Sequence, residues 1–264
     1  MIGFNAIGKL GRLGNQMFQY ASVKGIARKN NYNYCIPPSN NQDEWIDHQL
    51  FNPFKMANIS LLNVQYIDGE RPTIVEKNFT FDAELYNNCP KWVNLQGFFQ
   101  SEKYFKEIED EIREDFEFRD EIYNPAKEMI DSVDNPISLH IRRTDYLTNE
   151  NHNSLDLDYY KQALEKFDSD RTVIVFSDDP EWCKQQELFS DDRFLISENN
   201  DNYTDLCLMS LCKEHIIANS SFSWWAAYLN ANPNKKVIAP SKWFGPAYAD
   251  LNTKDLLPKS WIKL

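Results

Sequence analysis

The chain has 264 residues, of which 42% are hydrophobic and 26% are charged, a composition typical of a folded globular protein and not of a disordered one. Its 40 acidic and 28 basic residues give a formal net charge of −12. Because an acidic surface repels polyanions, we expect neither nucleic acid nor an anionic membrane surface as a partner. A phosphorylated ligand would have to be met by a few basic residues gathered locally.

The sequence has no apolar run long enough to cross a membrane and no signal peptide, so we expect a soluble, cytoplasmic protein. Its five cysteines are odd in number and include no Cys-x-x-Cys pair, which argues against a disulfide framework and against a zinc site. The sequence leaves the oligomeric state open.

The first half alternates strand-like and helical patterns, but prolines interrupt the pattern over residues 31–90. Met17, Phe18 and Ala21 fall on one face of its first helix. The predicted elements are strands over 2–7, near 34–36, near 62–66, near 73–76 and over 92–98, and helices over 15–29 and 102–118.

The second half alternates more regularly, which predicts a parallel, doubly wound sheet with ligands at the carboxyl ends of its strands. We place the join between the halves near 132–136, giving domains over 1–133 and 134–264. The predicted elements are strands over 136–141, 172–176, 194–196, 215–218 and 237–239, and helices over 157–167, from 179 onward, over 203–212 and over 222–229.

A glycine-rich segment, Gly8 to Gln16, joins the first strand to the first helix. Free backbone N–H groups and the helix dipole attract anions at such a position. The spacing is neither that of a Walker A loop nor that of the dinucleotide-binding fingerprint. The glycines alone fit a simple tight turn equally well, whereas Arg12 and Asn15 favour a binding site because both can reach the mouth of a cleft.

A second segment, His140-Ile-Arg-Arg-Thr-Asp-Tyr146, follows an apolar strand. Side-chain alternation places His140 and Arg142 on one side and Arg143 on the other. A guanidinium binds phosphate through two parallel hydrogen bonds, so we expect Arg142 to hold an anion within a local concentration of cations. The alternative is an internal ion pair between an arginine and Asp145.

A third segment, Val175 to Trp182, ends a strand and begins a helix. Asp179 is accounted for as the helix N-cap, with Pro180 at the first helical position. Asp178 has no such role, and we expect it to face the cleft as a substrate-binding residue.

A fourth segment, Ile216 to Ala227, runs from a buried strand through Ser220 and Ser221 into a helix N-terminus. Hydroxyls and backbone N–H groups at that point form a neutral cradle for phosphate. We assign Trp224 and Trp225 to the core. Asp205, on the preceding helix, can accept the N1–H and the amine of guanine, the alternative being a surface aspartate in a helix first turn.

Two Asp-x-Asp pairs, Asp156 with Asp158 and Asp168 with Asp170, have the spacing found in metal-dependent sugar transferases. Neither pair follows an apolar strand, and both lie at predicted helix ends, where capping is the expected role. We therefore predict no metal ligands.

Four segments together resemble the α-1,2-fucosyltransferases of glycosyltransferase family 11 over nearly the whole chain. They are Gly11-Arg-Leu-Gly-Asn-Gln-Met-Phe-Gln-Tyr-Ala21, His140-Ile-Arg-Arg-Thr-Asp-Tyr146, Phe176-Ser-Asp-Asp179 and Ala218-Asn-Ser-Ser-Phe-Ser-Trp-Trp225. The resemblance implies an α/β, GT-B-like fold with two Rossmann-like halves, an acceptor-side half over 1–133 and a donor-binding half over 134–264. It implies metal-independent, inverting transfer of L-fucose from GDP-β-L-fucose to the 2-hydroxyl of a galactoside glycan, with no cofactor beyond the donor.

The resemblance also assigns roles to individual residues, and we add Asp145, the nearest carboxylate in its motif, as the hypothetical general base. Arg142 matches the arginine that holds the donor diphosphate, and His140 matches the histidine that precedes it. The turn that contacts phosphate and nucleoside is matched by Ser220, Ser221 and Phe222, and the guanine-binding aspartate is matched by Asp205. The loop that reaches the active site is matched by Arg12 and Asn15.

Several alternatives stay open. Within the same class, the chain fits a fucosyltransferase of another linkage or an enzyme that uses another GDP-sugar. In a different class, it fits a catalytically silent protein that binds a sugar nucleotide or a glycan, although the intact Arg12, His140 and Arg142 argue against this. Animal members of the family carry a membrane anchor, so the resemblance is to a soluble bacterial or viral form.

Overall fold

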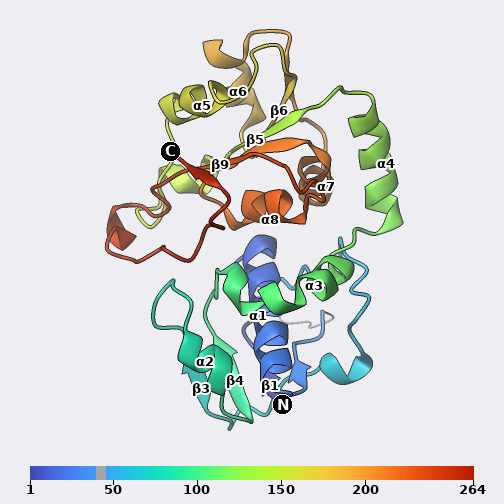
Figure 1. Ribbon diagram of the computed structural model, residues 1–264, viewed down its shortest axis with the longest axis vertical. Helices are drawn as coiled ribbons and strands as arrows, with labels where there is room; N and C mark the ends of the chain where they lie inside the picture. The colour runs from blue at the N-terminus through green and yellow to red at the C-terminus, as the bar shows by residue number, and fades with distance from the viewer. Residues whose placement is uncertain (40–45) are drawn as a thin grey trace. The chain divides into compact units, whose positions relative to one another are not determined.

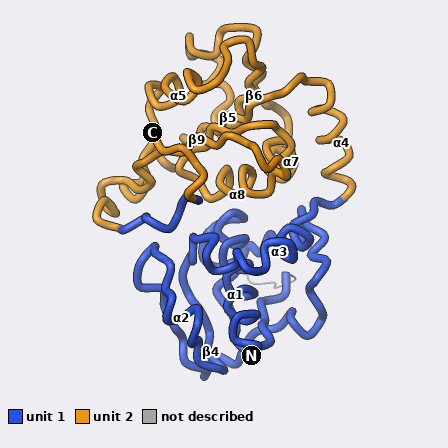
Figure 2. The backbone as a smooth tube through the Cα atoms, in the orientation of Figure 1, with its two compact units in different colours: residues 1–119, 252–258 blue, residues 120–251, 259–264 orange. Residues whose placement is uncertain are grey.

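The computed structural model describes residues 1–39 and 46–264. They form two compact units, unit 1 over 1–119 and 252–258, and unit 2 over 120–251 and 259–264 (Figure 2). This division differs from the boundary we placed after residue 133, because helix α4 (Asp120–Asp131) packs against helix α7 (Asn202–Leu211) of unit 2. The segment 252–258 joins unit 1 through Asp255, which pairs with Lys103 at 2.5 Å.

Unit 1 contains a parallel sheet with the strand order β2-β1-β4-β3 (Figure 1). The sequence located all four strands, but the strand predicted near 62–66 is instead a 3₁₀ turn followed by a single bridge between Ile36 and Val64. The elements of unit 1 are β1 (Ile2–Gly3), α1 (Leu13–Lys29), β2 (Tyr34–Cys35), η1 (Leu61–Asn63), β3 (Thr73–Val75), α2 (Ala83–Asn88), β4 (Val93–Gln96), η2 (Glu102–Tyr104), η3 (Lys106–Ile108) and α3 (Glu109–Asp115).

The predicted helix over 102–118 is divided into η2, η3 and α3. The division occurs where this segment crosses α1 in very close contact. A Cβ atom on Gly25 of α1 would lie 1.9 Å from the carbonyl oxygen of Tyr104. At the next residue, Phe105, the backbone leaves the helical region with a φ of −134°.

Helix α1 is buried around its whole circumference, so the one-sided apolar face expected from the sequence describes it incompletely. Its buried polar side chains bind loop carbonyls. The Gln19 amide donates to Leu10 O at 2.9 Å and Gly97 O at 3.0 Å, and the Gln16 amide donates to Asp47 O at 2.6 Å. These polar residues hold the glycine-rich loop in place, which explains why the helix does not have an amphipathic sequence.

A buried ion pair links α1 to α3. Lys24 Nζ lies 2.5 Å from Asp115 Oδ2, and both side chains are 0% exposed. The Tyr20 hydroxyl donates to the same oxygen at 2.7 Å, while the Asn58 N–H donates to Asp115 Oδ1 at 2.8 Å. Such a pair is tolerated in a core only when further hydrogen bonds satisfy the charges, as they do here.

Unit 2 contains a parallel sheet with the order β10-β9-β8-β5-β6-β7. The sequence missed α4, which has Pro125 inside it, and the two-residue strand β10. The elements of unit 2 are α4, β5 (Ile137–Ile141), η4 (Thr144–Leu147), α5 (Leu157–Leu164), β6 (Val173–Ser177), α6 (Pro180–Lys184), η5 (Glu187–Phe189), β7 (Phe194–Ile196), α7, β8 (Glu214–Ile216), α8 (Ser221–Leu229), β9 (Val237–Ala239), η6 (Pro246–Tyr248) and β10 (Ile262–Lys263).

The order of the strands in unit 2 marks a position for a ligand. The chain proceeds from β5 through β6 to β7 on one side, and then returns to form β8 on the other side of β5. In a doubly wound sheet, ligands bind in the crevice outside the carboxyl ends of the two strands where the direction reverses. That position is occupied here by the turns that follow β5 and β8.

Candidate active site

The turn after β5 is fixed by a carboxylate from the neighbouring strand. Ile141 pairs with Ser177 in the register of β5 and β6, which brings Asp178 beside the β5 turn. Asp178 Oδ1 accepts the Arg143 N–H at 2.9 Å; Asp178 Oδ2 accepts the Thr144 hydroxyl and lies 3.2 Å from Arg142 Nη1. Both oxygens of Asp178, which we expected to face a cleft, are thus engaged by the turn.

Arg142 lies at the centre of this turn and is paired with two acids. Besides Asp178, it reaches Asp145, with Nη2 2.6 Å from Asp145 Oδ1. Its guanidinium carbon is 5.4 Å from the centre of the Tyr146 ring. The ion pair with Asp145 that the sequence left open as an alternative is therefore present.

Arg143 takes a separate direction, as side-chain alternation predicted. Its Nε is 3.2 Å from Asp179 Oδ2, and its guanidinium carbon is 3.7 Å from the centre of the Trp182 ring. Asp179 also caps α6 by accepting the Trp182 N–H, which confirms the predicted cap.

Formal charges at this edge do not add up to the expected concentration of cations. Arg142 and Arg143 are set against Asp145, Asp178 and Asp179, and the five side chains sum to −1. The two arginines that we expected to gather positive charge here are each paired with a carboxylate, because the sequence shows which residues are near but not how they pair. An anion at this site has to compete with a carboxylate for the arginine.

The turn after β8 supplies the other side of the crevice. Ser220 is the N-cap of α8, and its hydroxyl accepts the Phe222 N–H at 3.3 Å. The first-turn N–H groups of a helix lack intrahelical partners and carry the positive end of its dipole. Trp224 and Trp225, both 0% exposed, lie in the core as predicted. Ser220, Ser221 and Phe222 thus stand beside the β5 turn.

His140 and Phe222 pack together across the two turns, with ring centres 5.8 Å apart. His140 is 5% exposed. Burial, with a smaller contribution from Arg142, lowers the pKa of His140 to about 4. The imidazole is consequently neutral near pH 7 and adds no positive charge to the site.

Three residues to which the sequence gave no role complete the site. The Tyr146 and His152 rings are stacked, 4.1 Å apart and inclined by 4°. The Tyr146 hydroxyl donates to the Asn219 carbonyl at 3.3 Å, so it connects the β5 turn to the β8 turn. Burial raises the pKa of Tyr146 to about 12. The available signal for Tyr146 was its place at the end of the His140–Tyr146 motif, and that for Asn219 was its place in the Ile216–Ala227 segment, whereas His152 lies in no motif.

Asp205 lies farther along the same edge, in the first turn of α7 after β7. Its Oδ1 accepts the Ser197 hydroxyl at 2.7 Å, and burial raises its pKa. Asp205 is therefore separate from the Arg142 turn but on the same carboxyl edge of the sheet.

The remaining predicted residues, Arg12 and Asn15, belong to unit 1. Arg12 is the exposed N-cap residue of α1 and makes no side-chain cap. The Gln100 amide donates to Asn15 Oδ1 at 2.7 Å and so orients the Asn15 side chain. Gly11, with a φ of +80°, gives room for that side chain, since a Cβ there would lie 2.3 Å from Asn15 Nδ2.

Several other sequence features have ordinary structural roles. Asp156 caps α5 by accepting the Tyr159 N–H, as predicted, and the five cysteines are buried free thiols. Across residues 1–39 and 46–264, no group of three or more His, Cys, Asp or Glu side chains is placed to hold a metal ion. In the same residues, no helix has the length and apolar character that crossing a membrane requires.

The sequence matches known proteins over its whole length. The family model for glycosyl transferase family 11 matches residues 1–264. An α-1,2-colitosyltransferase of Escherichia coli is 34% identical, over 96% of this chain and 96% of its own. The O-antigen biosynthesis glycosyltransferase WbnK of Escherichia coli is 30% identical, over 96% and 98%. Human galactoside α-(1,2)-fucosyltransferase 1 is 25% identical, over 94% and 74%.

Solved structures resemble the fold. A mutant of Arabidopsis thaliana FUT1 in complex with GDP superposes with a TM-score of 0.58 at 11% identity, covering 97% of this chain and 74% of that one. The NodZ α-1,6-fucosyltransferase soaked with GDP-fucose gives 0.53 at 14% identity, covering 86% and 91%. The predicted α/β, GT-B-like fold is confirmed.

We predict that His140 makes stability depend on pH. The ordinary pKa of 6.5 falls to about 4 on folding, so below pH 6.5 the unfolded chain binds a proton that the folded chain does not. Stability from this residue is therefore complete above pH 6.5 and is lost as the pH falls towards 4. Replacing His140 by Gln should reduce the fall in unfolding free energy between pH 7 and pH 5 by about 2 kcal/mol.

Urea denaturation of the wild type and of His140→Gln at both pH values measures this difference. Because the comparison is between pH values within each protein, a uniform loss of stability in the variant does not affect it. Two proteins with the same pH dependence would show that His140 is not held neutral.

Proposed function

Because the chain belongs to glycosyltransferase family 11, we propose that it transfers L-fucose from GDP-β-L-fucose to the 2-hydroxyl of a terminal galactose on a glycan, with inversion and without a metal ion. The observation that carries this proposal is the reversal of strand order between β5 and β8, which places Arg142 in the turn after one strand and the N-terminus of α8 after the neighbouring one. Relatives named for transfer in α-1,2 linkage, one of them to galactosides, support the linkage and the acceptor.

In this proposal the donor lies along the carboxyl edge of the unit 2 sheet. Arg142 and the N-terminus of α8 bind its diphosphate, and the Asp205 carboxylate accepts hydrogen bonds from guanine. Asp205 follows β7, which is three strands from β8, and three strand spacings amount to about 14 Å. A nucleoside diphosphate is long enough to span that separation. The solved neighbours that bind GDP or GDP-fucose support this choice of donor.

The reaction is a single displacement. The acceptor oxygen forms a bond to the anomeric carbon of fucose from the face opposite GDP, while the bond from that carbon to the β-phosphate oxygen breaks. Negative charge develops on the leaving phosphate, where Arg142 and the dipole of α8 stabilise it. The acceptor hydroxyl loses its proton to a base, and GDP leaves.

The two acids beside Arg142 have different roles. Asp178 is 18% exposed and is also held by the Arg143 N–H and the Thr144 hydroxyl, whereas Asp145 is 45% exposed. A donor phosphate displaces the more exposed Asp145 and leaves Asp178 in place as the residue that positions Arg142. The displaced Asp145 carboxylate is then available as the general base.

A second donor is favoured by one observation, the 34% identity to an α-1,2-colitosyltransferase. Colitose is L-fucose without its 3-hydroxyl, so GDP-colitose presents the same diphosphate and the same reacting carbon. Incubation with each donor and a panel of galactosides, followed by linkage analysis of the products, tests the function. We expect an α-1,2-linked product from GDP-fucose. Product from GDP-colitose alone would reassign the donor, another linkage would reassign the acceptor, and GDP binding without transfer would favour a silent binding protein.

We predict that Arg142→Ala lowers kcat by about 10²–10³-fold, the usual loss when one preorganised group that stabilises transition-state charge is removed. Arg142→Lys should recover part of the rate, since an ammonium keeps the charge but not the paired donors. Arg143→Ala is the matched control, because its side chain faces Asp179 and Trp182. Steady-state kinetics with GDP-fucose measure all three, and an Arg142→Ala variant with near-normal kcat would remove the leaving-group role.

We predict that Asp145→Asn lowers both kinetic constants, each for its own reason. Loss of the general base should lower kcat by about 10²–10⁴-fold. Loss of the charge that competes for Arg142 should lower the KM for the donor. The exposed Asp192→Asn is the control for a general change of surface charge. A near-normal kcat in Asp145→Asn would exclude it as the base, and an unchanged donor KM would contradict its displacement by phosphate.

A further inference from the structure

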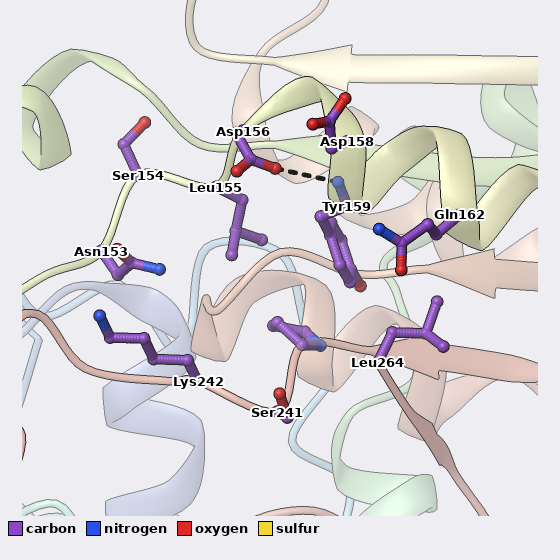
Figure 3. Close-up of a pocket in the computed structure, with 11 residues that line it drawn as sticks. Asn153, Ser154, Leu155, Asp156, Asp158, Tyr159, Gln162, Ser241, Lys242 and Leu264 are labelled. Atoms are coloured by element: carbon purple, nitrogen blue, oxygen red, sulfur yellow. Dashed lines mark hydrogen bonds between the residues drawn. The ribbon is translucent and has the colours of Figure 1, made fainter.

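Unit 2 contains a pocket on the same edge of its sheet as the turns that follow β5 and β8. This pocket has a volume of about 510 Å³ and lies between the residues that begin α5 and the segment that follows β9 (Figure 3). Asn153, Leu155 and Tyr159 come from the first side, and Pro240 and Lys242 from the second. A volume of this size is within the usual range for a small-molecule site.

Hydrogen bonds from side chains to backbone carbonyls hold the walls of the pocket in place. The Asn219 amide donates to Asn153 O and to Trp243 O, each at 2.8 Å, and so ties the two sides together. The Tyr159 hydroxyl donates to Ile217 O at 2.7 Å. Because Asn219 belongs to the β8 turn of the active site, the pocket and the crevice share one rigid connection.

In contrast, several polar side chains of the pocket have hydrogen-bonding groups that no described residue engages. Within the part of the chain that the structure describes, no hydrogen bond or ion pair engages the side chains of Asn153, Gln162 or Lys242. In Figure 3, Lys242 extends towards Asn153, and Gln162 reaches back towards Tyr159 from the opposite end. Donors and acceptors with unused capacity therefore surround a floor of Leu155, Tyr159 and Leu264.

The charges of the pocket select the chemistry of its ligand. The pocket is lined by one cation, Lys242, and by two carboxylates, Asp156 and Asp158. The carboxylates would repel a phosphate, and Lys242 would repel an ammonium group. A neutral polyhydroxylated ring can donate to the amide oxygens, accept from Lys242 and lay its C–H face on Tyr159.

We propose that this pocket binds a neutral sugar ring of the enzyme's glycosyl substrates, an inference that rests on the proposed function. The pocket lies at the end of β9, the neighbour of β8, and one strand spacing is about 5 Å. The ring belongs to the acceptor glycan, beyond the galactose that reacts, or to the donor, and the experiment separates these sources.

The test uses the full chain and four variants. Gln162→Ala and Lys242→Met each remove polar groups, Gln162→Trp fills the pocket, and Lys161→Met is the control on the same helix, outside the pocket. The probes are GDP-fucose, methyl β-galactoside, lactose and a tetrasaccharide that ends in β-galactose. Thermal unfolding confirms that each variant is folded.

We expect Gln162→Ala and Lys242→Met each to raise one KM by about threefold to tenfold, the value of one hydrogen bond, and Gln162→Trp to raise it further. A rise for the tetrasaccharide but not for methyl β-galactoside places an acceptor ring in the pocket. A rise for GDP-fucose alone places the donor sugar there. The proposal would be overturned if every KM value of the three pocket variants stayed within twofold of wild type.

Ligand-detected NMR measures binding of the tetrasaccharide and of GDP-fucose without requiring turnover. It therefore tests the pocket independently of the proposed function. If the wild type transfers no sugar, the proposed function fails, but binding that Gln162→Trp abolishes and Lys161→Met retains still supports the pocket. If the wild type transfers sugar and Gln162→Trp binds both probes as tightly as wild type, the pocket proposal fails alone.

Discussion

The active edge of unit 2 depends on one carboxylate, that of Asp178. It follows β6 and holds the turn that follows β5 through a backbone N–H, a hydroxyl and a guanidinium. Without it, Arg142 would be a long, flexible side chain at the end of a strand, and its entropy would oppose any fixed geometry. The parallel register of β5 and β6 makes the contact possible, since it brings the first residues after both strands together. The fold therefore produces the site by aligning strand ends.

Under the proposed function, the same arrangement bears on how an acidic protein would bind a dianionic donor. The five charged side chains of the β5 and β6 turns carry no positive surplus, so long-range attraction does not bring the donor in. In the proposed binding mode, affinity comes from exchange, in which phosphate takes the place of Asp145, and from the uncharged N–H groups of α8. The ion pairs with Asp145 and Asp178 orient Arg142 before any ligand binds, which would reduce the entropy cost of ordering it in the proposed complex.

The sequence predicted those features that local patterns encode. Strands β7 and β9, the Asp179 cap and the buried Trp224 and Trp225 were found because periodicity and capping chemistry act within a few residues. Helix α4 was missed although its apolar residues recur with helical spacing, because it contains Pro125 and lies where we placed the join between the halves. The partners of Asp178 could not be assigned because pairing is a property of distance in space. His152 lacked any motif, since its value comes from stacking on Tyr146. The roles of the site residues themselves stay predictions.

The proposed binding positions follow one another along the carboxyl edge of the unit 2 sheet. From β7 to β9, its carboxyl edge presents Asp205, then the Arg142 and Ser220 turns, then the pocket beside Tyr159. A guanine, a diphosphate and a sugar ring have the same order in a sugar nucleotide and its acceptor complex. Chemical character changes along the edge, from a half-buried carboxylate, through paired charges and helix N–H groups, to a pocket where amides, Lys242 and two carboxylates surround an aromatic floor. Because each group lies on a segment that follows a strand of one sheet, the strand separation sets the approximate spacing between the three proposed binding positions. In this proposal, the loops between them determine which base, which sugar and which glycan are accepted.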